Sequence, residues 1–200
     1  MNSNSLISVI VNCYNGEKFI KKCINSILNQ TYTNFEIIFW DNKSSDKSLS
    51  IIQQFNDKRL KVFNSTNHTN LSTARNYALN ESKGEYICFL DVDDYWDEKK
   101  LEIQIKCFNN NIGLSFSNFW YIKTYENRKT IQKIDLKFNE GFINKVIKKY
   151  EIVISTIMFK NDLLKNFGIQ FNEKYHIIGD FDFLLILSLI TEVNHVKDHL

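Results

Sequence analysis

Tyr86-Ile87-Cys88-Phe89-Leu90-Asp91-Val92-Asp93-Asp94 is the stretch that decides the fold of this chain. It begins with a short apolar run, which predicts a buried central strand, and it ends in three carboxylates. In open α/β sheets ligands bind at the carboxyl ends of strands, and two aspartates at such an end can hold a hard cation such as Mg²⁺ or Mn²⁺. The alternative is an acidic turn in which Asp94 or Asp97 is the N-cap of the next helix.

The chain before this stretch repeats a strand and a helix three times. The expected strands cover residues 6–11, 35–40 and 60–63, and the helices that follow them lie near residues 19–28, 49–55 and 72–82. This alternation predicts a largely parallel sheet with helices on both faces. Tyr14 and Asp41 lie in the polar loops after the first two strands, so we expect them to meet Asp91 and Asp93 at one edge of the sheet. Such convergence is the geometry expected of a nucleotide site.

The sequence after Asp94 is less regular. Its pattern predicts helices at residues 99–108, 141–150, 161–167 and 179–190, and strands at residues 112–125, 130–136 and 152–159. No low-complexity linker and no internal repeat divides the chain. We therefore expect a single domain over residues 1–200.

Composition is that of a soluble globular protein. Hydrophobic residues make up 44% and charged residues 24% of the chain, and a net charge of +2 gives no strong attraction to nucleic acid. The four cysteines lack Cys-x-x-Cys spacing and lie in apolar stretches, which indicates free thiols in a reducing compartment. Residues 1–5 lack the features of a signal peptide, and the most apolar run, residues 183–190, is shorter than the ~20 residues of a membrane span. We expect a cytoplasmic protein.

Motifs along the chain carry a family resemblance. Residues 7–15 are similar to Val-Ser-Val-Ile-Ile-Pro-x-Tyr-Asn, residues 26–32 to Ser-x-Leu-x-Gln-Thr, and residues 41–46 to Asp-Asp-Gly-Ser-x-Asp. Further matches are Ala74-Arg75-Asn76, Gly84-Glu85-Tyr86, Leu90 to Asp94, Ser155 to Phe159, and Gly179 to Asp182. Each motif is weak alone, but in this order, over nearly the whole chain, they resemble glycosyltransferase family two, the inverting GT-A-type sugar transferases.

This resemblance implies both a fold and an activity. The implied fold is a GT-A-type, Rossmann-like α/β fold, with a mixed, mostly parallel sheet flanked by helices. The implied activity is that of a metal-dependent, hexosyltransferase-type enzyme that moves a sugar from a nucleotide-diphospho-sugar, UDP-linked, to a hydroxyl of a saccharide or lipid-linked acceptor. The implied context is bacterial surface polysaccharide or lipo-oligosaccharide assembly, with peripheral contact at the cytoplasmic membrane face. Residues 1–94 would bind the nucleotide-sugar and residues 95–200 the acceptor.

The resemblance also gives roles to residues of the donor half. Tyr14 would stack on the nucleotide base, although an exposed loop tyrosine is the alternative. Asp41 would accept a hydrogen bond from a uracil-like N–H, or would simply start a helix. Arg75 would face the base or the diphosphate, or would be a solvated helix charge. Asp91 would contact the ribose or a metal ion, and Asp93 would be the main ligand of Mn²⁺ or Mg²⁺ at the leaving diphosphate.

In the acceptor half the resemblance places the general base at Asp180. The alternative is that Asp180 caps its helix and Asp182 is the base. Burial would raise the pKa of Asp180 and the helix N-terminus would lower it, and the sequence does not say which wins. The four histidines are isolated from any Cys or His pair that would indicate a zinc site, so we expect surface roles for them, His68 included.

The chain departs from the family pattern at four places. Asn12 replaces a proline, residues 68–70 replace a glycine-containing loop, Gly179 replaces a glutamate, and Ile186 replaces an arginine. The chain also ends at Leu200, before a Tyr-Arg-x-x-His-like segment that many members carry, so we expect it to be C-terminally truncated. These departures support an alternative function, that of a non-catalytic nucleotide-sugar-binding module. A phosphatase with an aspartate nucleophile is disfavoured, because that chemistry follows a first strand and not a fourth.

Overall fold

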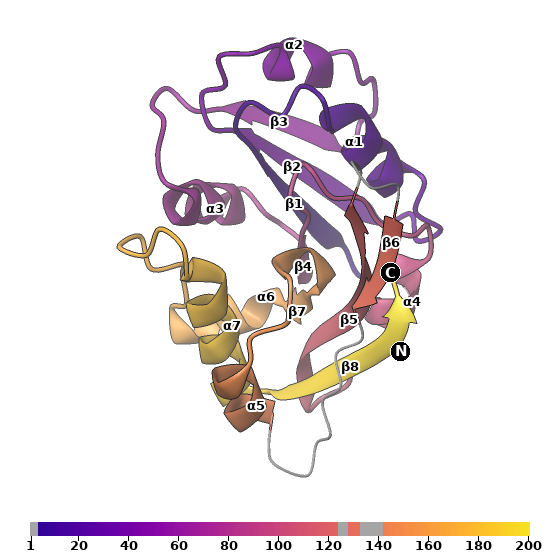
Figure 1. The fold of residues 1–200 in the computed structure, drawn as a ribbon, viewed down its shortest axis with the longest axis vertical. Helices are drawn as coiled ribbons and strands as arrows, with labels where there is room; N and C mark the ends of the chain where they lie inside the picture. The colour runs from indigo at the N-terminus through magenta and orange to yellow at the C-terminus, as the bar shows by residue number, and fades with distance from the viewer. Residues whose placement is uncertain (1–3, 124–127, 133–141) are drawn as a thin grey trace.

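The computed structural model describes residues 4–123, 128–132 and 142–200 (Figure 1). Within these residues the strands form an eight-stranded sheet in the order β3-β2-β1-β4-β7-β5-β6, with β8 beside β5. Their bounds are β1 Ile7–Cys13, β2 Phe35–Asp41, β3 Leu60–Asn64, β4 Tyr86–Phe89, β5 Ile112–Lys123, β6 Arg128–Gln132, β7 Met158–Lys160 and β8 Glu192–His199.

Helices connect these strands and cover the sheet. Their bounds are α1 Ile20–Leu28, α2 Ser48–Ile52, α3 Leu71–Asn80, α4 Lys100–Ile105, α5 Phe142–Lys148, the 3₁₀ turn η2 Ile154–Thr156, α6 Asn161–Phe167 and α7 Gly179–Ile190. None of the helices in the described part of the chain is long and apolar enough to cross a membrane.

The sheet is mixed and mostly parallel, as the sequence predicts. Strand β1 pairs in parallel with β2 and with β4, and β2 pairs in parallel with β3. Strand β7 runs antiparallel to both β4 and β5, while β8 runs parallel to β5. The chain leaves β1 in one direction, to β2 and β3, and returns on the other side as β4. In such sheets ligands bind at the carboxyl ends of the strands where the chain reverses, which here is the edge at β1 and β4.

Apolar residues bury both faces of the parallel strands. On one face Ile7, Val9 and Val11 of β1 pack with the apolar residues of α1 and with Leu101 of α4. On the other face Ile10 packs in a cluster that contains residues of α3, α5 and α7. This alternation with a period of two explains why β1 reads as a continuous apolar run.

Two segments differ from the sequence-based expectation. The strand expected at residues 152–159 is instead η2 followed by β7, because Thr156 Oγ1 donates a hydrogen bond to the Val153 carbonyl at 2.7 Å and so favours a local turn. The chain after α7 forms β8, which the pattern did not indicate. Parts of the expected strands and of the helix at residues 141–150, namely residues 124–125, 133–136 and 141, lie outside the described residues.

Candidate active site

Asp41 is the last residue of β2, and its carboxylate is buried. Its Oδ2 accepts a hydrogen bond from the Ser44 N–H at 3.0 Å, whereas its buried Oδ1 has no partner among the described residues. A buried carboxylate oxygen without a donor is costly, and a ligand N–H at this place would remove the cost. The arrangement fits the predicted base-binding role and not a helix-start role, since α2 begins only at Ser48.

Tyr14 lies in the loop after β1 and is 51% exposed. Its ring contacts that of His68, with centroids 4.1 Å apart and planes tilted by 39°. His68 Nδ1 lies 3.0 Å from the Asn42 carbonyl, which can only accept, so Nδ1 donates. His68 is exposed as expected, but it is not isolated, because the loop that carries it reaches the predicted base site. The sequence signal was the departure of residues 68–70 from the family pattern.

Arg75 lies on α3, whose first turn is capped by Asn70 Oδ1 accepting from the Thr73 N–H at 2.9 Å. Its side chain is only 2% exposed. Arg75 Nη2 donates to Asp91 Oδ1 at 2.9 Å, and Nη1 donates to Asp180 Oδ1. The guanidinium therefore bridges the end of β4 and the start of α7. Asp91 and Asp180 take both terminal nitrogens, so the arginine is not the solvated helix charge of the alternative interpretation.

Asp180 lies in the first turn of α7, beside α3 (Figure 1). Burial raises the pKa of the Asp180 carboxyl; the Arg75 charge acts in the opposite direction, and the negative charge of Asp91 adds to the increase. The net pKa is raised, so burial outweighs the Arg75 charge. Asp182, the alternative base, has no side-chain hydrogen bond to another described residue, so it is Asp180 that joins the cluster.

Tyr150 borders the same cluster. It follows α5, and its ring meets that of Phe181 edge-on, with centroids 5.2 Å apart. Burial raises the pKa of the Tyr150 hydroxyl, and the nearby Asp180 charge raises it further. No sequence pattern indicates this contact, because Tyr150 and Phe181 lie in segments that only the fold brings together.

The acidic residues after β4 have different environments. Asp93 is exposed, whereas Asp94 is partly buried, and its Oδ2 accepts a hydrogen bond from Ser155 Oγ at 2.6 Å. Burial raises the pKa of Asp94, although the bond from Ser155 opposes the increase. The helix-capping alternative for Asp94 is therefore wrong. Asp97 Oδ1 accepts a local hydrogen bond from the Lys99 N–H at 2.9 Å, but Lys99 is the N-cap of α4 and no side chain caps this helix.

The residues after β4 are suited to a divalent cation whose remaining ligands would come from the donor substrate. Asp91 and Asp93 are hard oxygen ligands at one strand end, and Mg²⁺ or Mn²⁺ is commonly held by one or two carboxylates together with substrate phosphates. Within the described residues no three His, Cys, Asp or Glu side chains gather into a ready-made metal cluster.

Comparison with known proteins identifies the family. A sequence model described as "Glycosyl transferase family 2" matches residues 8–173. The chain belongs to this family. Among curated relatives, the chain is 33% identical over 190 residues to the UDP-Glc:alpha-D-GlcNAc-diphosphoundecaprenol beta-1,3-glucosyltransferase WfgD of Escherichia coli. It is 30% identical over 188 residues to the E. coli enzyme WfaP, which has the same descriptive name. Each match covers 94% of this chain and 71% of the relative.

A solved structure supports the glycosyltransferase family 2 fold. The structure of S. aureus TarS 1-349 in complex with UDP-GlcNAc matches 96% of this chain with a TM-score of 0.79 and 25% sequence identity. The chain spans 56% of that protein. The mixed, mostly parallel GT-A-type sheet is thus confirmed, and as a family member the chain is a glycosyltransferase.

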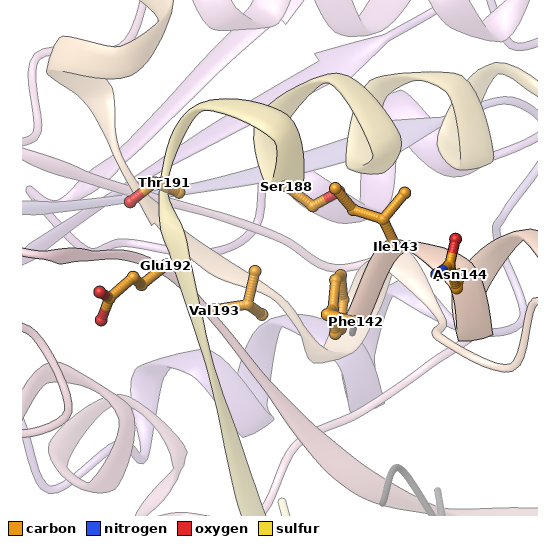
Figure 2. A pocket seen from close by; sticks show the side chains of 7 residues that line it. All are labelled: Phe142, Ile143, Asn144, Ser188, Thr191, Glu192 and Val193. Carbon is orange, nitrogen blue, oxygen red and sulfur yellow. The ribbon is translucent and has the colours of Figure 1, made fainter. Parts of the chain in front are cut away.

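A separate hollow lies outside this cluster. It has a volume of about 530 Å³ and lies between α5 and the junction of α7 with β8 (Figure 2). Its lining consists of Phe142, Ile143, Asn144, Ser188, Thr191, Glu192 and Val193. None of the predicted site residues of this glycosyltransferase contributes to its lining.

Proposed function

We propose that this chain catalyses the inverting transfer of a sugar from a UDP-linked donor to a hydroxyl of a lipid-linked saccharide, as a step in bacterial surface polysaccharide assembly. The observation that carries the proposal is the Arg75 bridge, which brings Asp91 of the donor half to Asp180 of the acceptor half. The names of the E. coli relatives support the donor and acceptor classes. The chain spans only part of each relative, so the activity of the whole protein is also something that we propose.

The donor would bind at residues 1–94. Asp41 Oδ1, buried and without a partner, would accept the uracil N–H, and the exposed surface of Tyr14 would stack on the base. His68 contacts Tyr14 and would border the same base. Arg75 would contribute mainly by its charge, since carboxylates hold both of its terminal nitrogens.

Asp93 and Asp91 would hold Mn²⁺ or Mg²⁺ beside the diphosphate. When bound, the ion would neutralise the negative charge that develops on the leaving group. Asp93 is exposed and Asp91 is half-buried at the strand end, so both can reach a ligand at this edge of the sheet. Asp93→Asn would remove one ligand charge while keeping the shape of the side chain.

Asp180 would take the proton of the acceptor hydroxyl. In an inverting transfer the acceptor oxygen attacks the anomeric carbon from the face opposite the diphosphate, so the base belongs on the acceptor side of the cleft. The raised pKa of Asp180 makes it a better proton acceptor than an ordinary carboxylate. Arg75 would hold the carboxylate in orientation through its bond to Oδ1. The acceptor would bind along residues 95–200, at the cytoplasmic face of the membrane.

Gly179 replaces the acidic residue usual before Asp180, and this departure motivates the second candidate: a member of this glycosyltransferase family that binds nucleotide-sugar without transferring it. A Cβ at Gly179 would lie 2.7 Å from Ser72 Oγ, so α3 packs closely where a larger side chain would stand. The close packing nonetheless keeps Asp180 against Arg75, which favours the enzyme.

Incubation of the purified protein with a panel of UDP-sugars, with and without Mn²⁺, tests the proposal. We expect a Mn²⁺-dependent rise in melting temperature with UDP-sugars, and sugar transfer to a lipid-diphosphate-linked acceptor. Asp93→Asn should lose the Mn²⁺-dependent part of the shift. Binding of UDP-sugar without any transfer or hydrolysis would favour the module, and absence of binding would exclude both.

A further inference from the structure

The 3₁₀ turn η2 lies directly behind the acidic loop that follows β4. The hydroxyl of Ser155, in this turn, makes two hydrogen bonds to that loop. It accepts from the Asp91 N–H at 3.2 Å and donates to Asp94 Oδ2 at 2.6 Å. A hydroxyl has a single hydrogen to donate, and a carboxylate can only accept, so the two directions are fixed. One side-chain atom thus joins the backbone at Asp91 to the carboxylate of Asp94.

Buried side chains from the segment that contains α4 hold η2 in place. Trp96 Nε1 donates to the Ser155 carbonyl at 2.8 Å. Gln104 Nε2 donates to the Thr156 carbonyl at 2.9 Å, and Lys100 Nζ lies 3.4 Å from the same oxygen. Trp96, Gln104, Lys100 and Ser155 are all buried. Buried and satisfied networks of this kind are rigid, so η2 provides a fixed support.

We propose that Ser155 is a positioning residue for glycosyl transfer, which fixes the loop of residues 91–94 so that Asp91 and Asp93 face the cation and diphosphate together. The inference rests on the proposed function of that loop. Ser155 would not touch substrate, and it would act through the backbone of Asp91 and the side chain of Asp94. The Ser155 hydroxyl binds the Asp94 carboxylate and so keeps it against η2. Asp91 and Asp93 would then be the carboxylates that face the ligand.

Ser155→Ala removes both hydrogen bonds and little volume. The loop would lose its support, and the carboxylate of Asp94 would be left beside Asp91 and Asp93 without its donor. Loss of a group that orients metal ligands costs about 10–100-fold in metal affinity or activity. The base site at Tyr14 and Asp41 belongs to other strand ends, so affinity for UDP alone should stay within about twofold.

The matched control is Ser117→Ala. Ser117 lies on β5, is fully buried, and its hydroxyl has no hydrogen-bond partner among the described residues. The substitution deletes the same atom from an equally buried site, outside the η2 network. Ser155→Thr keeps the hydroxyl and should restore most of the lost affinity. Asp94→Asn removes the charge from this hydrogen bond on the other side, because the amide oxygen still accepts from Ser155 but more weakly, and it should reproduce part of the defect.

Calorimetric titration of UDP into each variant, with and without Mn²⁺, tests the proposal. In the wild type Mn²⁺ should strengthen UDP binding. In Ser155→Ala this Mn²⁺-dependent gain should fall about 10-fold or more, with metal-free affinity unchanged and Ser117→Ala like the wild type.

An undiminished Mn²⁺ gain in both Ser155→Ala and Asp94→Asn would overturn the positioning role while leaving the proposed function in place. An equal loss of metal-free and Mn²⁺-dependent affinity would also overturn it, because that pattern indicates general damage. If Ser155→Ala does not fold, the Asp94→Asn titration decides by the same criteria. A wild type that binds no UDP would instead refute the proposed function, and the positioning role with it.

Discussion

Asp41 has an unusual environment for a carboxylate, since it is almost fully buried and one of its oxygens has no hydrogen-bond partner in the described part of the chain. If that oxygen accepts the uracil N–H, Asp41→Ala should weaken UDP binding by about 1–3 kcal/mol, the scale for losing a hydrogen bond to a charged group. Calorimetry without metal ion measures this loss directly.

Cytidine diphosphate is the matched control ligand for Asp41. Its base has a ring nitrogen that accepts where uracil donates, so it cannot give Asp41 the same hydrogen bond. The wild type should prefer UDP, and Asp41→Ala should lose most of that preference. Equal losses for the two nucleotides would mean that Asp41 acts on the loop and not on the base.

Asp180 and Asp182 both lie in the first turn of α7. Matched substitutions at the two positions therefore test which of them is the general base. Asp180→Asn keeps the shape and removes the basicity, so transfer should fall by about 10²–10⁴-fold, the usual contribution of a positioned base. Donor affinity should stay nearly unchanged. Asp182→Asn should transfer at close to the parent rate, because Asp182 is not bonded to Arg75. The assignment fails if steady-state kinetics show the reverse pattern.

At the scale of elements, the close contact between α3 and α7 positions the Arg75 bridge. Ser72 Oγ donates to the Tyr175 carbonyl at 3.0 Å, and it lies 2.7 Å from the place where a Cβ at Gly179 would stand. Gly179→Ala should therefore displace the Ser72 hydroxyl and cost about 1 kcal/mol in the free energy of unfolding. The double variant with Ser72→Ala should recover stability beyond the sum of the single changes, as denaturant titration would show. Strictly additive effects would mean that the two helices do not touch here.

The same pair of helices shows what the sequence could and could not predict. Strands β1 to β4 and the positions of Tyr14, Asp41 and Asp91 follow from local patterns, namely apolar runs that end in polar loops. The bridge from Arg75 to Asp180 joins residues far apart in the chain, so no local pattern indicates it. Strand β8 has a mainly polar sequence, Glu-Val-Asn-His-Val-Lys-Asp-His, and its strand character depends on pairing with β5. The turn η2 replaced an expected strand because a threonine side chain bonds to the backbone there.

At the scale of the whole molecule, the core contains a charged side chain that has no carboxylate partner among the described residues. Lys100 is fully buried, donates to Gln104 Oε1, and lies 4.6 Å from the centre of the Trp96 ring. Burial lowers the pKa of the Lys100 amine from 10.5 to about 8. A pKa difference of this size means that folding disfavours the charged amine by roughly 3 kcal/mol. At neutral pH this cost reduces the stability of the whole domain.

Lys100→Met should therefore stabilise the protein at pH 7, by about 1–3 kcal/mol once the lost hydrogen bonds are counted. Between pH 8 and 10.5 the unfolded wild type binds more protons at this lysine than the folded protein does, so its free energy of unfolding rises with pH. The advantage of Lys100→Met should accordingly shrink by about 2 kcal/mol between pH 7 and pH 9.5. Burial also raises the pKa of Cys88 to about 12, which lowers the stability of both proteins above pH 9. The Lys100 charge opposes that increase, so only part of the Cys88 effect cancels in the difference. Urea titrations of the two proteins at several pH values measure this difference, and an advantage that stays constant with pH would show that Lys100 keeps an ordinary pKa in the core.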